Sequence, residues 1–556
     1  MRYIICALFL VFLSCSESPK IDTVTARQDT RPNILYIMLD DLGFSDLGCY
    51  GSEISTPNID ALAASGQRFS GFRTAPMCGP TRAMMISGNS NHIEGMGRMI
   101  NTNPKNARYK GLEHYEEDIS DRIVAFPKLL QQAGYSTSFV GKWHLGWEDK
   151  SLPSNHGFDN TWALRNAVGN YWNGRNYMIS HPEKIDTISY YFNNGQATEY
   201  PEGTYATEWY TDKMIGFLKK EQQENKDKPF FAFASYTAPH WPLQAPQAYW
   251  DKYKGKYDDG YQALMEKRLR GLKEKGIIAP EINLPPYPDM KKWESLTAEE
   301  KKYETRKMEI FAGMVENVDF HIGRIIQYLK ESGQYNNTII IVHSDNGAAA
   351  EDLTKVSWLK EYILSWNDNS YENMNNANSF IALGSNWAQA CSVPFRKYKQ
   401  KMYEGSMASP FIIVGKGIPT STKVRNDFFC IQDIAPTFLD IAGTTYPNEW
   451  KGKAIVPQRG VSILPYVQQH SPKVHNEDFI FAIEHRRTGF LRKGDWKITN
   501  QADAANNELF KLFNLKNDFS EQEDLAKEEP DKLAELLAGW EQYKKEVGVI
   551  FLPKLN

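Results

Sequence analysis

Short, largely apolar segments, each bounded by polar residues, recur along the chain. Four of them lie at 34–39, 136–140, 229–234 and 338–342. Segments of this length and character are typical of strands that are buried on both faces of a sheet. Because helical stretches separate them, they predict an α/β fold with a large doubly wound mixed sheet flanked by helices.

Helical periodicity is clearest between residues 308 and 329. Apolar side chains recur there at intervals of three and four residues, at Phe311, Val315, Val318, Ile322 and Ile325. This spacing puts them on one face of a helix, which is expected to pack on the sheet.

The chain is expected to divide into a large and a small unit. After residue 445 the pattern changes to short strand-like pieces at 479–482 and 495–498, followed by a helical stretch at 531–547. We therefore predict a main domain at 31–445 and a C-terminal α+β subdomain, an antiparallel sheet plus a helix, at 446–556. Two polar segments, 250–305 and 360–390, are interpreted as insertions that shape access to a site.

The N-terminus has the pattern of an export signal. Arg2 precedes an apolar run at 3–13, which is too short to span a bilayer. The run ends at Cys15 and then turns polar, an order that resembles a bacterial lipoprotein signal. We expect residues 1–15 to be this signal, with Cys15 lipidated, and 16–30 to be a tether; ordinary secretion is the alternative. The protein is thus predicted to be exported, either periplasmic or anchored to the outer membrane through lipid alone.

Composition argues against several classes of function. A net charge of −4 over 556 residues, with no stripe of Lys and Arg, argues against a nucleic-acid partner. The cysteines outside the signal, Cys49, Cys78, Cys391 and Cys430, form no C-x-x-C pair. A zinc ribbon or a disulfide framework is therefore not expected.

Polar side chains follow each of the four apolar segments. The residues with catalytic or ligand chemistry at these places are Asp40 and Asp41, Lys142 and His144, His240, and Asp345 and Asn346. Any one of them is more often structural than catalytic. The carboxyl ends of the strands of a doubly wound sheet, however, meet at one crevice. Together these residues predict an active site there.

Cys78 precedes a helix-prone run at 83–86, with Pro80 where a first helical turn tolerates the missing N–H. A sulfur at this position lies near unpaired N–H groups and the positive end of the helix dipole. It would suit a low-pKa thiolate, or a group that carries or attacks an anion. A lone cysteine is more often a packed apolar residue, so the interpretation depends on its neighbours.

The oxygen donors indicate the kind of metal. Asp40, Asp41, Asp345 and Asn346 are hard ligands without a cluster of Cys or His around them. Such a set suits Ca²⁺, or Mg²⁺, better than zinc. A metal together with nearby Lys, Arg and His side chains is suited to an anionic ester of sulfate or phosphate.

The order of these motifs resembles one enzyme family. The segment at 78–88, Cys-Gly-Pro-Thr-Arg followed by Ser-Gly, matches the C-x-P-[ST]-R-x(4)-[ST]-G signature of the type I sulfatases. The segments at 40–41, 141–146, 238–240, 344–347, 394–405 and 494–497 are similar to the family in the same order. The similarity spans nearly the whole chain after the tether and resembles the arylsulfatase-like bacterial branch of the alkaline phosphatase superfamily.

This resemblance implies a sulfuric ester hydrolase that acts on sulfated glycans or aryl sulfates. It implies that a maturase oxidises Cys78 to formylglycine, whose hydrate is the nucleophile. It further implies a calcium ion whose ligands are Asp40, Asp41, Asp345, Asn346 and the modified Cys78.

The resemblance also implies roles for the charged side chains. Arg82 and Lys142 would steady the hydrate, and His144 would be the base for elimination of sulfate. His240 and Lys399 would bind the sulfate oxygens, with His240 as the acid for the departing oxygen. Because 397–401 departs from the family pattern, a lysine beside Lys399 could be the contact instead.

Two other interpretations are compatible with the sequence. One is a formylglycine-dependent phosphodiesterase or phosphonate monoester hydrolase of the same superfamily. The other is a non-catalytic binding protein in which Cys78 is never oxidised. No feature of the sequence identifies the sugar. Five residues are candidates for the substrate pocket, although each can also be explained as structural: His92, Arg98, Trp147, Trp172 and Trp241.

Overall fold

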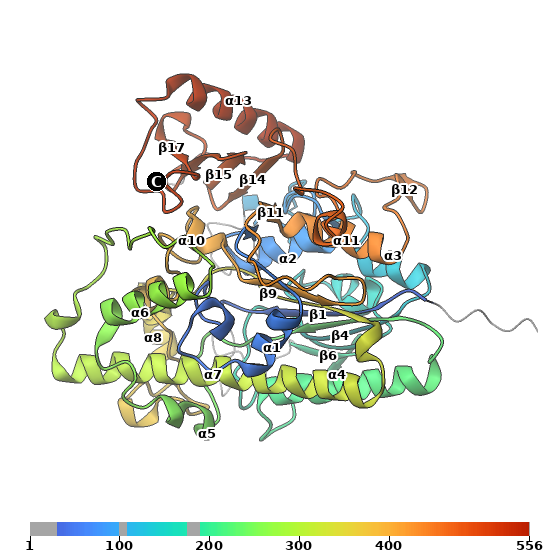
Figure 1. Cartoon of the computed structure of the whole chain (residues 1–556), viewed down its shortest axis with the longest axis horizontal. Coiled ribbons are helices and arrows are strands. Elements are labelled where there is room, and N and C mark those ends of the chain that lie inside the picture. The colour runs from blue at the N-terminus through green and yellow to red at the C-terminus, as the bar shows by residue number, and fades with distance from the viewer. Residues whose placement is uncertain (1–29, 99–107, 110, 175–189, 555–556) are drawn as a thin grey trace, which may run out of the picture.

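The computed structural model describes residues 30–98, 108–109, 111–174 and 190–554. The expected signal, Cys15 and all but the last residue of the expected tether lie outside these ranges. Within them, the predicted α/β fold is confirmed: a large mixed sheet is flanked by helices, and a separate antiparallel sheet lies near the C-terminus (Figure 1). No helix among the described residues combines the length and apolar character needed to cross a membrane.

The main sheet has nine strands in the order β2-β10-β9-β1-β8-β4-β5-β6-β7. These are β1 (Asn33–Leu39), β2 (Gln67–Phe69), β4 (Ser136–Lys142), β5 (Asn160–Leu164), β6 (Tyr191–Asn193), β7 (Gln196–Thr198), β8 (Phe230–Ser235), β9 (Thr338–Ser344) and β10 (Phe411–Gly415). The central strands β9, β1, β8, β4 and β5 run parallel, and the outer strands are antiparallel to their neighbours. The four segments predicted as strands are thus adjacent in the sheet.

The central strands are apolar throughout because both faces of the sheet are covered. Every residue of β1 is buried. Leu35 and Ile37 join the core on one face, whereas Ile34 and Tyr36 join the core on the other. This is the burial that a continuous apolar run predicts.

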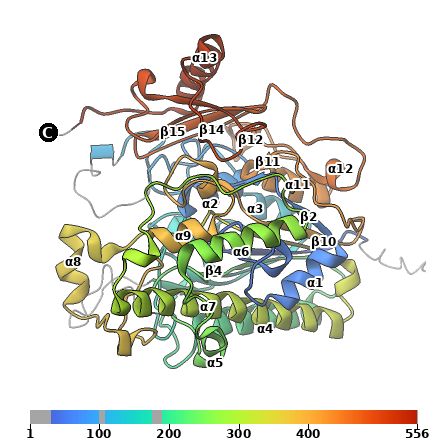
Figure 2. The same ribbon diagram turned by 60° about the vertical axis from the view of Figure 1, so that its left-hand side comes forward.

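Helices cover each face. On one side lie α1 (Pro57–Ser65), α4 (Ala206–Glu224), α5 (Gln247–Trp250), α6 (Gly260–Glu274) and α7 (Ala298–Glu331), and on the other lie α2 (Cys78–Ser87), α3 (Phe126–Gln132) and α11 (Ile434–Ile441) (Figures 1 and 2). The helix predicted at 308–329 is part of α7. It begins earlier because a capping box starts it: Thr297 accepts from the Glu300 N–H at 3.1 Å, and Glu300 accepts from the Thr297 N–H at 2.8 Å.

The segment at 250–305, interpreted from the sequence as an insertion that shapes access to a site, also contributes to the hydrophobic core. Its helix α6 buries Tyr261, Leu264 and Leu272 in the core that covers the sheet. Trp387 packs against this helix, and the centroid of its ring lies 4.5 Å from that of Tyr261. The remaining short helices are α8 (Ser357–Leu364), α9 (Ser385–Cys391), α10 (Glu404–Met407) and α12 (Leu464–Val467).

The C-terminal unit is a four-stranded antiparallel sheet with a helix packed on it. The strands β14 (Ile480–His485), β15 (Thr488–Lys493), β16 (Trp496–Asn500) and β17 (Lys511–Asn514) pair in sequence order, and α13 (Pro530–Val547) buries Trp540 against them. Two strand pairs, β3 (Phe72–Arg73) with β11 (Phe429–Cys430) and β12 (Glu449–Trp450) with β13 (Lys453–Ala454), complete the described strands. The predicted C-terminal sheet and helix are confirmed, and the boundary at residue 445 stays a prediction.

Candidate active site

The carboxyl ends of four neighbouring strands carry the polar residues singled out in the sequence. Asp40 and Asp345 directly follow β1 and β9, which pair in parallel and in register. Lys142 ends β4, and Ser235 ends β8, which lies between β4 and β1. The expected convergence at one edge of the sheet is therefore confirmed.

Three buried carboxylates each pair with one cation at this edge. Lys142 Nζ lies 2.5 Å from Asp40, Arg82 Nη2 lies 2.8 Å from Asp345, and Lys399 Nζ lies 2.8 Å from Asp41. All six side chains are at most 3% exposed. Charges so deep in the protein require these partners, because an unpaired buried ion is strongly destabilising.

Arg82 fixes the geometry of the group. Besides Asp345, its guanidinium donates to the Lys142 carbonyl at 2.6 Å and to Ser235 Oγ at 2.7 Å. It thereby joins α2, where it resides, to the ends of β4, β8 and β9. The five donors of a planar guanidinium allow this, whereas an ammonium would not reach all three strands.

Cys78 is the first residue of α2 and is 2% exposed. Its Sγ and carboxylate oxygens of Asp40 and Asp345 all lie within 4.8 Å of one another. The expectation of a low-pKa thiolate is wrong for this thiol. Burial raises the pKa of Cys78, and the opposing effects of Lys142 and Lys399 do not compensate for it.

The donor set fits a hard divalent cation. Asp40 Oδ1 and Asn346 Oδ1 are buried and have no hydrogen-bond partner among the described residues. The Asn346 amide is oriented by its Nδ2, which donates to Asp41 at 2.7 Å. Burial and the adjacent Asp345 carboxylate raise the pKa of Asp40. Crowded carboxylates with free oxygen atoms are the surroundings in which Ca²⁺ or Mg²⁺ binds.

The two histidines are held in their neutral form. Burial lowers the pKa of His144 well below its usual value, and the positive charge of Lys142 acts in the same direction. Burial and the positive charge of Lys399 lower the pKa of His240 in the same way. His240 Nδ1 lies 2.7 Å from the Trp241 carbonyl, which assigns the ring proton to Nδ1. Its Nε2, 3.3 Å from Lys399 Nζ, then accepts from that lysine. His144 has a φ of 59° and a buried Nδ1 without a described partner.

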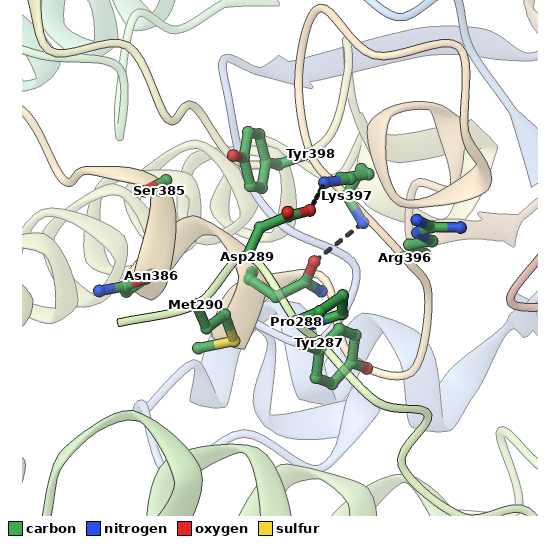
Figure 3. Close-up of a pocket in the computed structure, with 10 residues that line it drawn as sticks. Tyr287, Pro288, Asp289, Met290, Ser385, Asn386, Arg396, Lys397 and Tyr398 are labelled. Atoms are coloured by element: carbon green, nitrogen blue, oxygen red, sulfur yellow. Dashed lines mark hydrogen bonds and ion pairs between the residues drawn. The ribbon is translucent and has the colours of Figure 1, made fainter. Parts of the chain in front are cut away.

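Of the lysines at 397–401, Lys399 is the one in this group. Its side chain is 3% exposed, and its N–H donates to the Ala348 carbonyl at 3.1 Å. Lys397 points elsewhere, into a pocket where its Nζ pairs with Asp289 (Figure 3). Lys401 is exposed.

One of the five candidate pocket residues contacts the site directly: the ring of Trp241 lies 4.3 Å from that of His240. The other four make contacts elsewhere: His92 with Glu484 at 3.0 Å, Arg98 over the Tyr109 ring at 3.8 Å, Trp147 N–H with Asp118 at 2.9 Å, and Trp172 Nε1 with the Asn375 carbonyl at 3.0 Å.

A second buried ion network was missed by the sequence reasoning. Glu404 accepts from Arg73 at 2.5 Å and from Lys497 at 2.9 Å, and Lys497 also pairs with Glu521 at 2.8 Å. Glu404 and Lys497 lie in the motifs at 403–405 and 494–497, so charged residues inside those motifs were the available signal. The network joins the C-terminal sheet to the segment that carries Lys399.

Comparison with known proteins identifies the family of this chain. The family model described as sulfatase matches residues 32–444, and the model for the C-terminal part of N-sulphoglucosamine sulphohydrolase matches 396–542. An uncharacterized sulfatase of Schizosaccharomyces pombe is 37% identical over 95% of this chain and 96% of its own. The arylsulfatase of Klebsiella aerogenes is 34% identical over 79% of this chain and 92% of its own.

A solved structure of Ps i-CgsB in complex with k-i-k-neocarrahexaose superposes with a TM-score of 0.62, at 25% identity and over 92% of each chain. The sulfatase model covers well over half of the chain, and the relatives are similar over most of their length. The chain therefore belongs to the sulfatase family and is a sulfuric ester hydrolase.

Proposed function

We propose that this sulfatase acts through formylglycine, formed from Cys78 by a maturase, and a calcium ion. The observation that carries the proposal is the place of Cys78. Its sulfur begins a helix, shares one space with the Asp40 and Asp345 carboxylates, and is surrounded by buried cations. A raised thiol pKa makes the unmodified cysteine a poor nucleophile, so oxidation would give this position its chemistry.

Formylglycine and the calcium ion would each supply one part of the chemistry. Formylglycine supplies a hydrated aldehyde as nucleophile, and calcium supplies positive charge, held by Asp40, Asp41, Asp345 and Asn346. The fit rests on the hard oxygen donors and on the two buried oxygen atoms without partners.

The side chains of this protein would bind the ester and move its protons. Lys399 Nζ and His240 Nε2 lie 3.3 Å apart and can contact the same sulfate group. Negative charge beside His240 favours its protonated form, which could then donate to the departing oxygen. His144, neutral and with a free Nδ1 among the described residues, is suited to accept a proton when sulfate leaves. Arg82 and Lys142 would keep positive charge beside the reacting position.

Sulfated glycans are the proposed substrate class, with aryl sulfates as smaller esters that fit the same group of residues. The similarity to a structure solved with neocarrahexaose supports a carbohydrate ligand. No observation favours the phosphodiesterase or the binding-protein interpretation over this one. Residues 1–29 lie outside the described ranges, and export with lipidation at Cys15 is retained as a proposal, testable by labelling with a radioactive fatty acid.

The test compares hydrolysis of 4-nitrophenyl sulfate with that of bis(4-nitrophenyl) phosphate. The protein is co-expressed with a maturase, supplied with calcium, and analysed by mass spectrometry for the aldehyde at position 78. Cys78→Ala is expected to abolish sulfate release, while Cys49→Ala, a change of another buried cysteine, retains it. Dominant phosphodiester turnover, or full activity of Cys78→Ala, would contradict the proposal.

A further inference from the structure

The turn between β14 and β15 has an unfavourable backbone for its sequence. His485 pairs with Thr488, so the loop consists of two residues, Arg486 and Arg487, with φ values of 53° and 64°. Two-residue hairpin loops with positive φ at both positions strongly favour Asn-Gly and similar pairs. Each non-glycine residue held in this region costs about 1–3 kcal/mol, and such strain concentrates at functional sites.

The two arginines of the turn differ in their surroundings. Arg487 is fully engaged: its guanidinium bonds both oxygens of Asp503, at 2.8 and 3.1 Å, and the Leu552 carbonyl at 2.7 Å. Arg486 is exposed and makes no hydrogen bond or ion pair within the described part of the chain. Packing therefore explains one arginine of the strained turn and leaves the other without a structural role.

The turn lies at the end of the C-terminal sheet that contacts the segment carrying Lys399. Phe490, three residues after the turn, pairs with Thr499, whose Oγ1 donates to the Met402 carbonyl at 2.9 Å. Met402 is close in sequence to Lys399, whose Nζ lies 3.8 Å from Glu351. Protein atoms around the exposed Arg486 side chain displace part of its water and lower its pKa, while negative charge on Glu351 and on the Cys78 sulfur acts in the opposite direction. Arg486 thus lies within electrostatic reach of the residue that begins α2.

Buried polar atoms without a hydrogen-bond partner among the described residues lie near this turn. Glu351 has a buried Oε2 without a partner, and His485, which is 1% exposed, has none at either ring nitrogen. Buried polar atoms that lack partners are uncommon in folded proteins and are expected to be satisfied by water or a ligand. They mark the space beside Arg486 as a polar one.

We propose that Arg486 binds a second anionic group of the substrate, a carboxylate or another sulfate, while Lys399 and His240 hold the sulfate that is cleaved. The inference rests on the sulfatase function proposed above. A guanidinium is suited to this task because it binds carboxylate and sulfate oxygens in a bidentate manner. Its position outside the group of paired cations makes it a specificity residue rather than a catalytic one. The preferred esters are accordingly polyanionic.

The test measures sulfate release by ion chromatography from three esters. These are 4-nitrophenyl sulfate, 4-nitrocatechol disulfate and 4-(sulfooxy)phenylacetate, so that a second sulfate and a carboxylate are distinguished. The wild-type protein is expected to favour at least one of the dianionic esters about tenfold in kcat/KM. Arg486→Gln is expected to remove this preference through KM and to leave 4-nitrophenyl sulfate within about twofold. Arg487→Gln, the matched control, retains the preference.

A stability measurement separates recognition from folding. Arg486→Gly is expected to raise the midpoint of thermal unfolding, because glycine adopts positive φ without strain, and to lose the preference as Arg486→Gln does. The proposal is overturned if wild-type protein does not distinguish the esters, or if Arg486→Gln slows all three equally. Absence of sulfate release from every ester, with the aldehyde confirmed at position 78, would instead contradict the proposed function.

Discussion

Lys497 is the buried cation whose removal gives the sharpest test of how the C-terminal sheet is held to the segment that carries Lys399. Its side chain is 0% exposed and pairs with Glu404 and Glu521 at 2.9 and 2.8 Å. Lys497→Met keeps most of the side-chain volume and removes the charge. In this variant Glu404 keeps its ion pair with Arg73. The carboxylate that loses its cationic partner is therefore Glu521, whose side chain is 0% exposed.

The expected loss at pH 7 is about 3–5 kcal/mol of unfolding free energy, the usual effect of removing one partner of a buried ion pair. The loss depends on pH. Burial raises the pKa of Glu521 to about 7, with Glu404 acting in the same direction and Lys497 against it. An acid whose pKa is higher in the folded state binds more protons there, so stability falls as pH rises from about 4.5 to 7. Without Lys497 this fall is steeper, and the deficit of the variant is smaller at pH 5.

Urea unfolding, followed by tryptophan fluorescence at pH 5 and 7, measures this deficit. Lys511→Met is the control, because Lys511 lies on the same sheet, is 53% exposed and is 3.5 Å from Asp524. It is expected to change stability by less than about 0.5 kcal/mol. Adding Glu521→Gln to Lys497→Met should recover much of the loss by removing the unpaired charge. A deficit under about 1 kcal/mol at pH 7, or a deficit that is larger at pH 5 than at pH 7, would refute the reasoning.

Three further outcomes follow from the site. Lys399→Met is expected to lower kcat/KM for 4-nitrophenyl sulfate about 100-fold, and Lys397→Met to leave it within about twofold, because only Lys399 lies beside the carboxylates. Calcium should raise the midpoint of thermal unfolding, measured by scanning fluorimetry, and Asp345→Asn should abolish that shift. Gly141→Ala should destabilise by more than about 3 kcal/mol in urea unfolding, since its Cβ would lie 1.9 Å from the Ser235 carbonyl oxygen.

The sequence predicted the sheet and the meeting of its strand ends because both depend on local patterns. A continuous apolar run needs cover on both faces wherever it lies, and polar residues at its end lie at one edge of the sheet. Asp40 and Asp345 were identified in this way, although they are more than 300 residues apart. The helix at 308–329 was likewise correct in type, and only its start depended on the capping box at Thr297.

What the sequence did not predict depends on long-range packing. The raised pKa of Cys78 results from burial, which a helix-start motif does not reveal. The choice of Lys399 over Lys397 is fixed by contacts with Asp41 and Asp289, neither of which is near in sequence. For the same reason, the partners of Glu404 could not be named from its motif alone.

The balance of charge in the site explains why metal and substrate binding should depend on each other. Among the described residues there, four carboxylates, those of Asp40, Asp41, Asp345 and Glu351, face three cations, and the histidine pKa values are lowered. A divalent cation would therefore leave an excess of one positive charge in a buried space. Such an excess is unfavourable alone and is reduced by an anionic sulfate ester, which carries one negative charge. By linkage, each of the two ligands then strengthens the binding of the other.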